Sequence, residues 1–302
     1  MKIACITVTT NEFHLLDNWK SYYDIYKDEI DLHIIVDNAS SSEYKNLLYK
    51  NFPNSIILEQ KSNGGVTVAY NEGIRYALAK HEIDYILLAC PDVKFKSHSL
   101  TIMKNTLINR TDVGIVGPLM INNEDNNSIL GARLSKYLEP RFIMPSDINE
   151  YPDEFEVDYI SGGINMIKRG VYEKIGFQDE MLFMYGDEVD FDIRVKGAGY
   201  KILALKNAIC WHMHIFTDKS GMRSRLAYFL FSRNMFILYR KHLFGMQRFL
   251  GYLAFLYMAK SEIRKLLKNR NFDILKAYLH GAFLGSIGYY IIPLRYQRTL
   301  NK

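Results

Sequence analysis

Residues 2–11 read KIACITVTTN, a short apolar run that ends in the polar residues Thr9, Thr10 and Asn11. Such a run is typical of a buried β-strand followed by a loop. The same succession of apolar run, polar turn and amphipathic segment recurs over the next eighty residues. It predicts strands at 2–8, 32–36, 55–59 and 85–89, separated by helices at 15–26, 43–50 and 66–80. This alternation indicates right-handed βαβ units, and therefore an α/β fold whose mostly parallel sheet is flanked by helices.

Polar side chains follow three of these strands. Asn11 comes after the first, Asp37 after the second and Asp92 after the fourth. Ligands of parallel sheets bind at the carboxyl ends of the strands, so this placement predicts a binding site there. Taken alone, Asp37 is equally compatible with the N-cap of the next helix. The turn Asn63-Gly64-Gly65 lacks the lysine of a P-loop and does not fit the dinucleotide fingerprint.

The pattern after the strand expected at 113–118 is mixed. A small-residue turn, Ser161-Gly162-Gly163, precedes a helix expected at 169–175, and a strand is expected at 200–205. Between them a helix is expected to begin at Asp187 and to end near Gly199. From residue 223 onward helical patterning dominates.

An acidic cluster opens the helix at residue 187. Its members are Asp187, Glu188, Asp190 and Asp192. Acidic residues favour a helix N-terminus, but four carboxylates within six residues exceed what a cap needs. Like charges this close raise one another's pKa, which is one way to tune a base or recruit a cation.

A second candidate group lies at residues 210–214, which read CWHMH. In an extended segment alternate side chains point the same way, so His212 and His214 share one side. Together with Asp92 they form a plausible site for a hard cation, without specificity for zinc.

Charge divides the chain near residue 220. Residues 1–220 carry 23 Lys and Arg against 31 Asp and Glu, a net charge of −8, whereas residues 221–302 carry 15 against 2, a net charge of +13. Aromatic and aliphatic residues are interleaved with these cations, which favours an anionic membrane surface over nucleic acid. The alternative is a helical tail with a solvated basic face. The apolar segment 277–294 is interrupted by Gly, Ser and Pro, so we expect it to lie in the membrane interface rather than to span the bilayer.

Amino-acid composition limits the classes of protein to which the chain can belong. The chain has 302 residues, of which 48% are hydrophobic, 24% charged and 14% aromatic. These values indicate a folded globular protein. Three cysteines without a CxxC pair exclude a disulfide scaffold and a zinc ribbon. The apolar run at residues 3–8 is too short for a signal peptide, so we expect a cytoplasmic protein bound peripherally to the inner face of the cell membrane.

Several motifs together resemble the family 2 glycosyltransferases, and within them the bacterial rhamnosyltransferase-like branch. The motifs follow one another from residue 3 to about 243: Thr9-Thr10-Asn11, Val36-Asp37-Asn38-x-Ser40, Asn63-x-Gly65, Asn71-x-Gly73, Pro91-Asp92, Ser161-Gly162-Gly163, Phe183-x-Tyr185, Asp187-Glu188-Val189-Asp190, Arg194 with Gly199-Tyr200, and Ser232-Arg233-Asn234. The resemblance implies a GT-A fold, a nucleotide-sugar donor, a divalent metal (Mn²⁺ or Mg²⁺) and inversion at the anomeric carbon. The expected domains are a GT-A catalytic domain at 1–220, with a nucleotide-sugar half at about 1–118 and an acceptor half at about 119–220, and a basic helical region at 221–302.

The resemblance also implies roles for individual residues. The nucleotide sugar would be held by Thr9, Asn11, Asp37, Asn38, Asn63, Gly65, Asn71 and Asp92. The metal would be held by Asp92 with His212 or His214. Either Glu188 or Asp187 would be the catalytic base. Two positions depart from the family pattern: Cys90 stands where Asn or Asp is usual, and the usual Glu-Asp pair is Asp187-Glu188 here.

These roles agree with the chemistry of glycosyl transfer. The reaction passes through an oxocarbenium-like state while a nucleoside diphosphate leaves. A divalent cation neutralises the leaving group, and a carboxylate activates the acceptor hydroxyl. The expected partners are a nucleotide-sugar donor, a glycan or lipid-linked glycan acceptor and an anionic membrane surface, with no nucleic acid; a homo-oligomer is left open. The alternatives are a catalytically inactive glycan- or membrane-binding relative and a nucleotidyltransferase, although the latter would need basic residues after the first strand.

Overall fold

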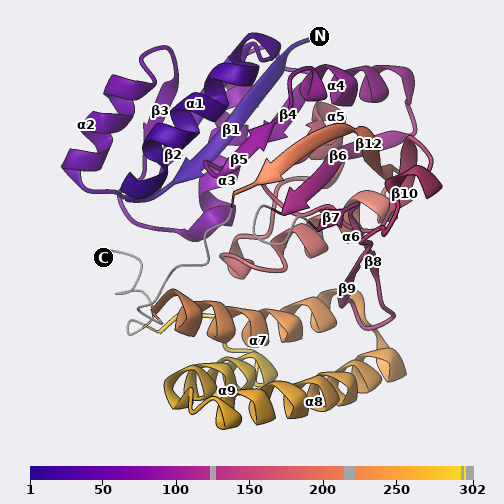
Figure 1. The fold of residues 1–302 in the computed structure, drawn as a ribbon. Coiled ribbons are helices and arrows are strands. Elements are labelled where there is room, and N and C mark those ends of the chain that lie inside the picture. Colours follow the sequence, from indigo (N-terminus) through magenta and orange to yellow (C-terminus); the bar gives the residue numbers. More distant parts are fainter. Residues whose placement is uncertain (123–126, 214–221, 294–295, 297–302) are drawn as a thin grey trace.

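The computed structural model describes residues 1–122, 127–213, 222–293 and 296. Within this part of the chain a ten-stranded sheet runs in the order β10-β12-β6-β11-β4-β1-β2-β3, with β5 paired to β12 and β7 paired to β6 (Figure 1). Its strands are β1 (Ile3–Thr9), β2 (Leu32–Asp37), β3 (Ile56–Glu59), β4 (Tyr85–Leu88), β5 (Val93–Phe95), β6 (Val113–Asn122), β7 (Ser128–Ile129), β10 (Glu154–Val157), β11 (Met166–Lys168) and β12 (Lys201–His212). A separate hairpin is formed by β8 (Ala132–Leu134) and β9 (Pro140–Phe142).

The central strands run in parallel. β1 pairs in parallel with β2 and β4, β2 with β3, and β12 with β6. β11 lies antiparallel between β4 and β6, and β10 lies antiparallel against β12. The predicted α/β fold with a mostly parallel sheet is therefore confirmed.

Six α-helices belong to the part of the described chain that surrounds the sheet. They are α1 (Leu16–Tyr26), α2 (Ser42–Asn51), α3 (Gly65–Lys80), α4 (Ser99–Asn109), α5 (Arg169–Ile175) and α6 (Asp187–Gly197). On one face of the sheet α3 approaches β1 and β2 closely, because a side chain at Gly73 would collide with Ile6 and Val36. On the other face Ile35 packs with Trp19 of α1 and Tyr44 of α2. The sheet is thus covered on both sides, as its apolar strands require.

β12 is longer than the sequence pattern predicts. The expected strand ended at Leu205, but the observed one continues to His212, with an irregularity in its pairing to β6 between Leu205 and Ile209. Its last residues pair antiparallel with β5, which places His212 opposite Val93. The end of β12 therefore lies beside the turn that follows β4.

Three helices follow the sheet: α7 (Met222–His242), α8 (Gly245–Lys268) and α9 (Phe272–Ser286). Figure 1 places α7 next to the sheet domain, and α8 and α9 on the far side of α7. The predicted C-terminal helical extension is confirmed. Among the residues described, no helix combines the length and apolar character needed to cross a bilayer.

Candidate active site at the strand ends

The loops that follow β1 and β2 are tied to each other by side chains. Asn11, whose backbone is left-handed (φ 49°), donates its backbone N–H to Ser40 Oγ at 3.0 Å, and its Oδ1 accepts from the backbone N–H of Ser41 at 2.9 Å. Asp37 is buried and accepts from the backbone N–H of Ser40 at 3.2 Å. Ser41, not Asp37, is the N-cap of α2. The Asp37 carboxylate therefore does not cap α2.

Asn38 links these loops to the glycine-rich turn. Its Nδ2 donates to Asn63 Oδ1 at 2.9 Å, and its Oδ1 accepts from the backbone N–H of Gly64 at 3.1 Å. Gly65 has φ +86°, and a side chain there would collide with Phe183. The structure thus brings together Asn38, Asn63 and Gly65, three of the residues that the family resemblance assigns to the nucleotide sugar.

Two of the residues predicted to hold the nucleotide sugar, Thr9 and Asn71, form hydrogen bonds with other residues of the protein. The Thr9 hydroxyl lies 2.6 Å from the Tyr44 hydroxyl and donates to Glu12 Oε2 at 2.9 Å. Asn71 is buried in α3, where its Nδ2 donates to the Gln178 carbonyl at 2.9 Å and its Oδ1 accepts from the Gln178 N–H at 3.1 Å. Asn71 therefore holds the segment that leads to the acidic helix, and contact of either side chain with a nucleotide stays a prediction.

Asp92 and His212 meet, as the sequence predicted. The β5–β12 pairing brings His212 Nε2 to 3.3 Å from Asp92 Oδ2. The backbone N–H of Met213 also donates to the Asp92 carbonyl at 2.8 Å, which fixes the end of β12 on this turn. His214 lies outside the described residues.

Cys90 packs between Asp92 and the small-residue turn. Its backbone N–H donates to the Gly163 carbonyl at 2.9 Å, and a side chain at Gly163 would collide with Cys90 Sγ. The Tyr70 hydroxyl lies 3.7 Å from the same sulfur. Burial, and then the charge of Asp92, raise the pKa of the Cys90 thiol well above its usual range. Cys90 is therefore a neutral thiol, which is a poor ligand for a hard cation.

The Asp187–Glu188 pair opens α6 on the other side of this turn. A side chain at Gly162 would collide with the Glu188 carboxylate, so glycine is required there. Asp187 is fully buried, and neither of its carboxyl oxygens has a hydrogen-bond partner in the part of the chain that the structure describes. Burial, and then the charge of Glu188, raise the pKa of Asp187 far above its usual range; burial also raises the pKa of Glu188. Both carboxyl groups therefore hold a proton to a higher pH than ordinary carboxyl groups do, and of the two the half-buried Glu188 is the more accessible.

The other two acids of the cluster have different surroundings. Asp192 accepts from the backbone N–H of Ile160 at 3.0 Å, and burial raises its pKa. For Asp190 the expectation that crowding raises the pKa is wrong. Burial alone would raise it, but hydrogen bonds from His242 and Lys241 and the charge of Arg194 lower the pKa of Asp190 to about 2. Asp190 is therefore an anion held by cations.

Comparison with known proteins identifies the family. The sequence profile of glycosyl transferase family 2 matches residues 5–176, which is more than half of the chain. The chain belongs to glycosyl transferase family 2. Its predicted family is thereby confirmed, and the matched range includes every donor-site residue discussed above.

Two curated relatives resemble the family 2 chain over about two thirds of its length. The low-salt glycan biosynthesis hexosyltransferase Agl10 of Haloferax volcanii is 25% identical over 211 residues, which cover 68% of this chain and 66% of the relative. The N-acetylglucosaminyl-diphospho-decaprenol L-rhamnosyltransferase of Mycobacterium tuberculosis is 23% identical over 216 residues, which cover 64% of this chain and 70% of the relative.

Solved structures confirm the predicted GT-A fold. GalNAc-T7 with UDP, GalNAc and Mn²⁺ superimposes with a TM-score of 0.58 at 13% identity, over 72% of this chain and 44% of that one. The mannosyltransferase PcManGT of Pyrobaculum calidifontis, in complex with GDP-Man and Mn²⁺, gives a TM-score of 0.56 at 13% identity, over 99% and 85% of the two chains.

In this family 2 chain, α7 holds the turn that presents the acid pair. The turn, residues 181–186, contains Phe183 and Tyr185 with left-handed backbones (φ 66° and 67°). Asn234 Nδ2 donates to the carbonyls of Leu182, Met184 and Tyr185 at 2.9, 2.8 and 2.7 Å. Arg233, which is 0% exposed, donates to the carbonyls of Met181 and Leu182. We name Arg233 and Asn234 the α7 clamp.

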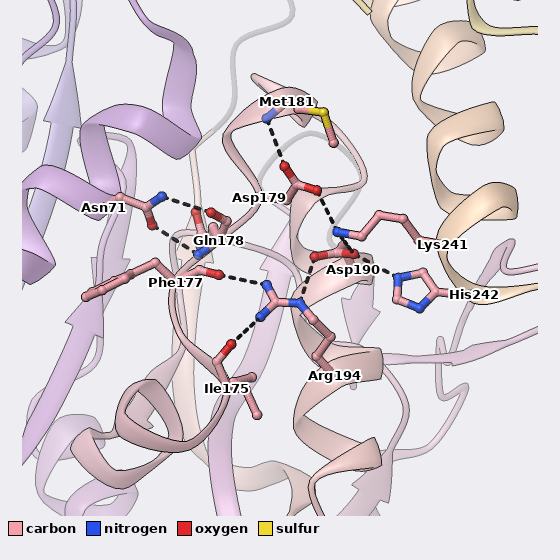
Figure 2. A network of polar contacts seen from close by, with 10 residues as sticks. All are labelled: Asn71, Ile175, Phe177, Gln178, Asp179, Met181, Asp190, Arg194, Lys241 and His242. Atoms are coloured by element: carbon pink, nitrogen blue, oxygen red, sulfur yellow. Dashed lines mark hydrogen bonds and ion pairs between the residues drawn. The ribbon is translucent and has the colours of Figure 1, made fainter. Parts of the chain in front are cut away.

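A second set of contacts from α7 fixes α6 itself (Figure 2). Lys241 Nζ lies 2.6 Å from carboxylate oxygens of both Asp179 and Asp190, and His242 Nε2 lies 2.8 Å from Asp190 Oδ1. Arg194 bonds Asp190 at 2.9 Å and also reaches the carbonyls of Ile175 and Phe177. Because these contacts cross the predicted boundary near residue 220, α7 is part of the scaffold of the site.

The α7 clamp gives a first testable prediction. Asn234→Ala removes the side-chain donor of the Met184 and Tyr185 carbonyls and one of the donors of the Leu182 carbonyl. We therefore expect turnover to fall ~10–100-fold through displacement of Glu188, while the KM for donor changes little. Steady-state kinetics checks this. Asn51→Ala is the matched control, because Asn51 Nδ2 donates to the Leu47 carbonyl within α2, away from the site. Unchanged turnover in Asn234→Ala, or a loss explained entirely by unfolding in a thermal melt, would refute a positioning role.

Proposed function

We propose that the chain is an inverting, metal-dependent glycosyltransferase. It would move a hexosyl or deoxyhexosyl group from a UDP- or TDP-sugar, TDP-rhamnose among them, to a growing cell-surface polysaccharide or lipid-linked glycan. The observation that supports this best is the arrangement around Cys90, with Glu188 on α6, Asp92 in the turn after β4 and His212 at the end of β12. A base and a diphosphate-binding pair on the two sides of one small-residue turn are what glycosyl transfer needs.

In this mechanism Glu188 acts on the acceptor. It accepts the proton of the acceptor hydroxyl as that oxygen forms its bond to the anomeric carbon. The bond between the anomeric carbon and the diphosphate oxygen breaks on the opposite side, so the configuration inverts. Gly162 leaves room for the Glu188 carboxylate, and the α7 clamp holds the turn that precedes α6, the helix from which Glu188 projects.

The residues present fit a cation shared with substrate. Asp92 and His212 supply one carboxylate and one imidazole, and no group of three or more His, Cys, Asp or Glu among the described residues could hold a metal alone. Mg²⁺ in nucleotide enzymes is commonly held by one or two carboxylates plus substrate phosphates. A cation held by Asp92 and His212, with the diphosphate, would neutralise the charge that develops on the leaving group. Support comes from GalNAc-T7 and PcManGT, whose structures contain Mn²⁺ with nucleotide or nucleotide sugar.

The proposed location is the inner face of the cell membrane, where a lipid-linked acceptor would be found. The Mycobacterium tuberculosis relative is named for a diphospho-decaprenol acceptor. The net charge of +13 over residues 221–302 is the second support, because anionic head groups attract such a region.

Removal of divalent metal is the test of the proposed reaction. We expect EDTA to abolish donor consumption and Mn²⁺ or Mg²⁺ to restore it, measured as release of UDP or TDP from the matching sugar nucleotides. Activity that persists in EDTA would contradict metal dependence. No consumption of any UDP-, TDP- or GDP-sugar with any metal would instead favour the inactive glycan- or membrane-binding relative.

A further inference from the structure

Two opposite sides of α7 are covered by other parts of the protein. Towards the sheet domain it presents Asn234, Leu238 and Lys241, which contact residues 179–190. Towards the other side it presents Phe236 and Tyr239, which pack with the aromatic residues of α8 and α9. Since residues 234, 238 and 241 lie on the opposite side of a helix from residues 236 and 239, α7 separates the sheet domain from an outer layer of two helices.

The buried sides of α8 and α9 both face α7. Phe255 of α8 lies 4.8 Å, between ring centroids, from Phe236 and 6.1 Å from Tyr278 of α9. Gly281 and Gly285 of α9 lie so close to α7 that a side chain at either would collide with its backbone. The remaining sides of α8 and α9 therefore point away from α7, and Figure 1 places both helices on the far side of α7 from the sheet domain.

These outward sides are rich in large apolar side chains. We name them the outer face, and its apolar members are Met246, Phe249, Leu253, Leu256 and Tyr257 of α8, Phe272, Leu279 and Phe283 of α9, and Ile287 directly after α9. Leu256 is 62% exposed, Tyr257 82% and Phe283 60%. Scattered apolar residues are normal on a surface, but eight on two adjacent helices and a ninth directly after them mark an interaction site.

The outer face is also basic. Its exposed cations are Lys260, Arg264, Lys265, Lys268, Arg270 and Lys276. α8 and α9 contain two acids, Glu262 and Asp273. Glu262 accepts from the Tyr228 hydroxyl at 2.8 Å and lies 3.6 Å from Lys265 Nζ, so it is partly neutralised. A partner that is complementary to the outer face must therefore have both negative charge and an apolar region.

We propose that the outer face docks on an anionic lipid bilayer, with its aromatic and aliphatic side chains at the boundary between head groups and acyl chains. Lys and Arg at the edges of such a face bind anionic head groups, and Phe and Tyr partition into this zone. A second copy of the chain fits less well, because pairing two outer faces would bring their like charges together. This inference rests on the proposed function only for its setting, since lipid binding needs no turnover.

The test is co-sedimentation of the full chain with vesicles of phosphatidylcholine that contain 0 or 30% phosphatidylglycerol. We expect binding that rises with phosphatidylglycerol. The double variant Leu256→Glu/Phe283→Glu should reduce it at least ~10-fold, because each glutamate removes an apolar anchor and adds a repelled charge. The control is Ile25→Glu/Ile108→Glu, which changes exposed apolar residues of α1 and α4 and should bind as the parent does.

A second pair of variants tests the charges. Lys260→Ala/Arg264→Ala/Lys268→Ala should lower binding to phosphatidylglycerol vesicles on the order of 100-fold. Lys50→Ala/Lys61→Ala/Lys80→Ala, which removes three exposed lysines of the sheet domain, should not. Absence of vesicle binding by the parent chain would overturn the proposal. So would a lipid-free dimer, seen by light scattering, that Leu256→Glu/Phe283→Glu converts to monomer. Donor consumption by the outer-face variants separates this result from failure of the proposed reaction.

Discussion

Glu188→Gln is expected to lower turnover at least ~100-fold, the low end for loss of a general base. Gln keeps the size of the side chain against Gly162 but cannot accept the acceptor proton. Donor affinity should be retained, because no predicted donor contact is removed. Steady-state kinetics with calorimetry of donor binding would measure both effects. Glu173→Gln, at an exposed carboxylate paired with Arg169, is the matched control and should be silent.

Asp187→Asn distinguishes the two members of the acid pair. Asp187 is buried whereas Glu188 is half-buried, so Asp187 is less accessible to an acceptor hydroxyl and an amide there should cost less turnover than Glu188→Gln. The pH profile gives a second readout. Because burial raises the pKa of Glu188, its carboxylate becomes available at a higher pH than that of an ordinary glutamate, and the acidic limb of kcat/KM should be displaced upward. If Asp187→Asn abolishes turnover and Glu188→Gln does not, the base is Asp187.

The strands and helices in the first half of the chain could be predicted from the sequence because the local residue patterns agree with the fold. Apolar runs bounded by polar turns predicted β1 to β4 within one residue at either end, and the turn at Asn63-Gly64-Gly65 marked the start of α3. The polar residues at the strand ends did gather at one edge, because parallel strands bring their carboxyl ends together. The pairing of Asp92 with His212 or His214 was predicted from the shared side of the two His and from the family resemblance, and the structure brings His212 to Asp92.

The hydrogen bonds that α7 makes to the candidate site could not be predicted from the sequence. Its polar triplet Ser232-Arg233-Asn234 lies within an apolar helical run, which is the one local sign that buried polar groups have partners elsewhere. The partners of Asn234 are carbonyls about fifty residues earlier, and nothing in either segment specifies the pairing. The low pKa of Asp190 has the same origin, because Lys241 and His242 reach it from α7.

The end of β12 was missed for a different reason. The polar pair Lys206-Asn207 interrupts the apolar pattern after Leu205, and pairing with β6 becomes irregular there before resuming at Ile209. The alternation of apolar and polar residues along a strand is broken at such an irregularity, because the side chains beyond it change to the opposite face of the sheet. The extra residues matter, because they deliver His212 to Asp92.

Asp92→Ala is expected to abolish Mn²⁺-dependent binding of the donor. The substitution removes the carboxylate of the proposed metal pair and leaves His212 alone, so the loss should exceed the ~10–100-fold typical for an outer-shell partner of a metal. The fold should survive, because the turn is also held by the backbone bonds from Cys90 to Gly163 and from Met213 to Asp92. Calorimetry with donor, in Mn²⁺ and in EDTA, measures the effect.

Two further variants make the result specific to the metal pair. Asp84→Ala removes an exposed carboxylate just before β4, at the opposite end of the same strand, and should bind donor normally. Cys90→Ser should also retain Mn²⁺-dependent binding, because a soft sulfur is a poor ligand for a hard cation. If Asp92→Ala binds donor with unchanged affinity in Mn²⁺, Asp92 is not a metal ligand. If Cys90→Ser loses binding as fully as Asp92→Ala does, the cation is held by the sulfur as well, and the departure from the family pattern at residue 90 has changed the metal site itself.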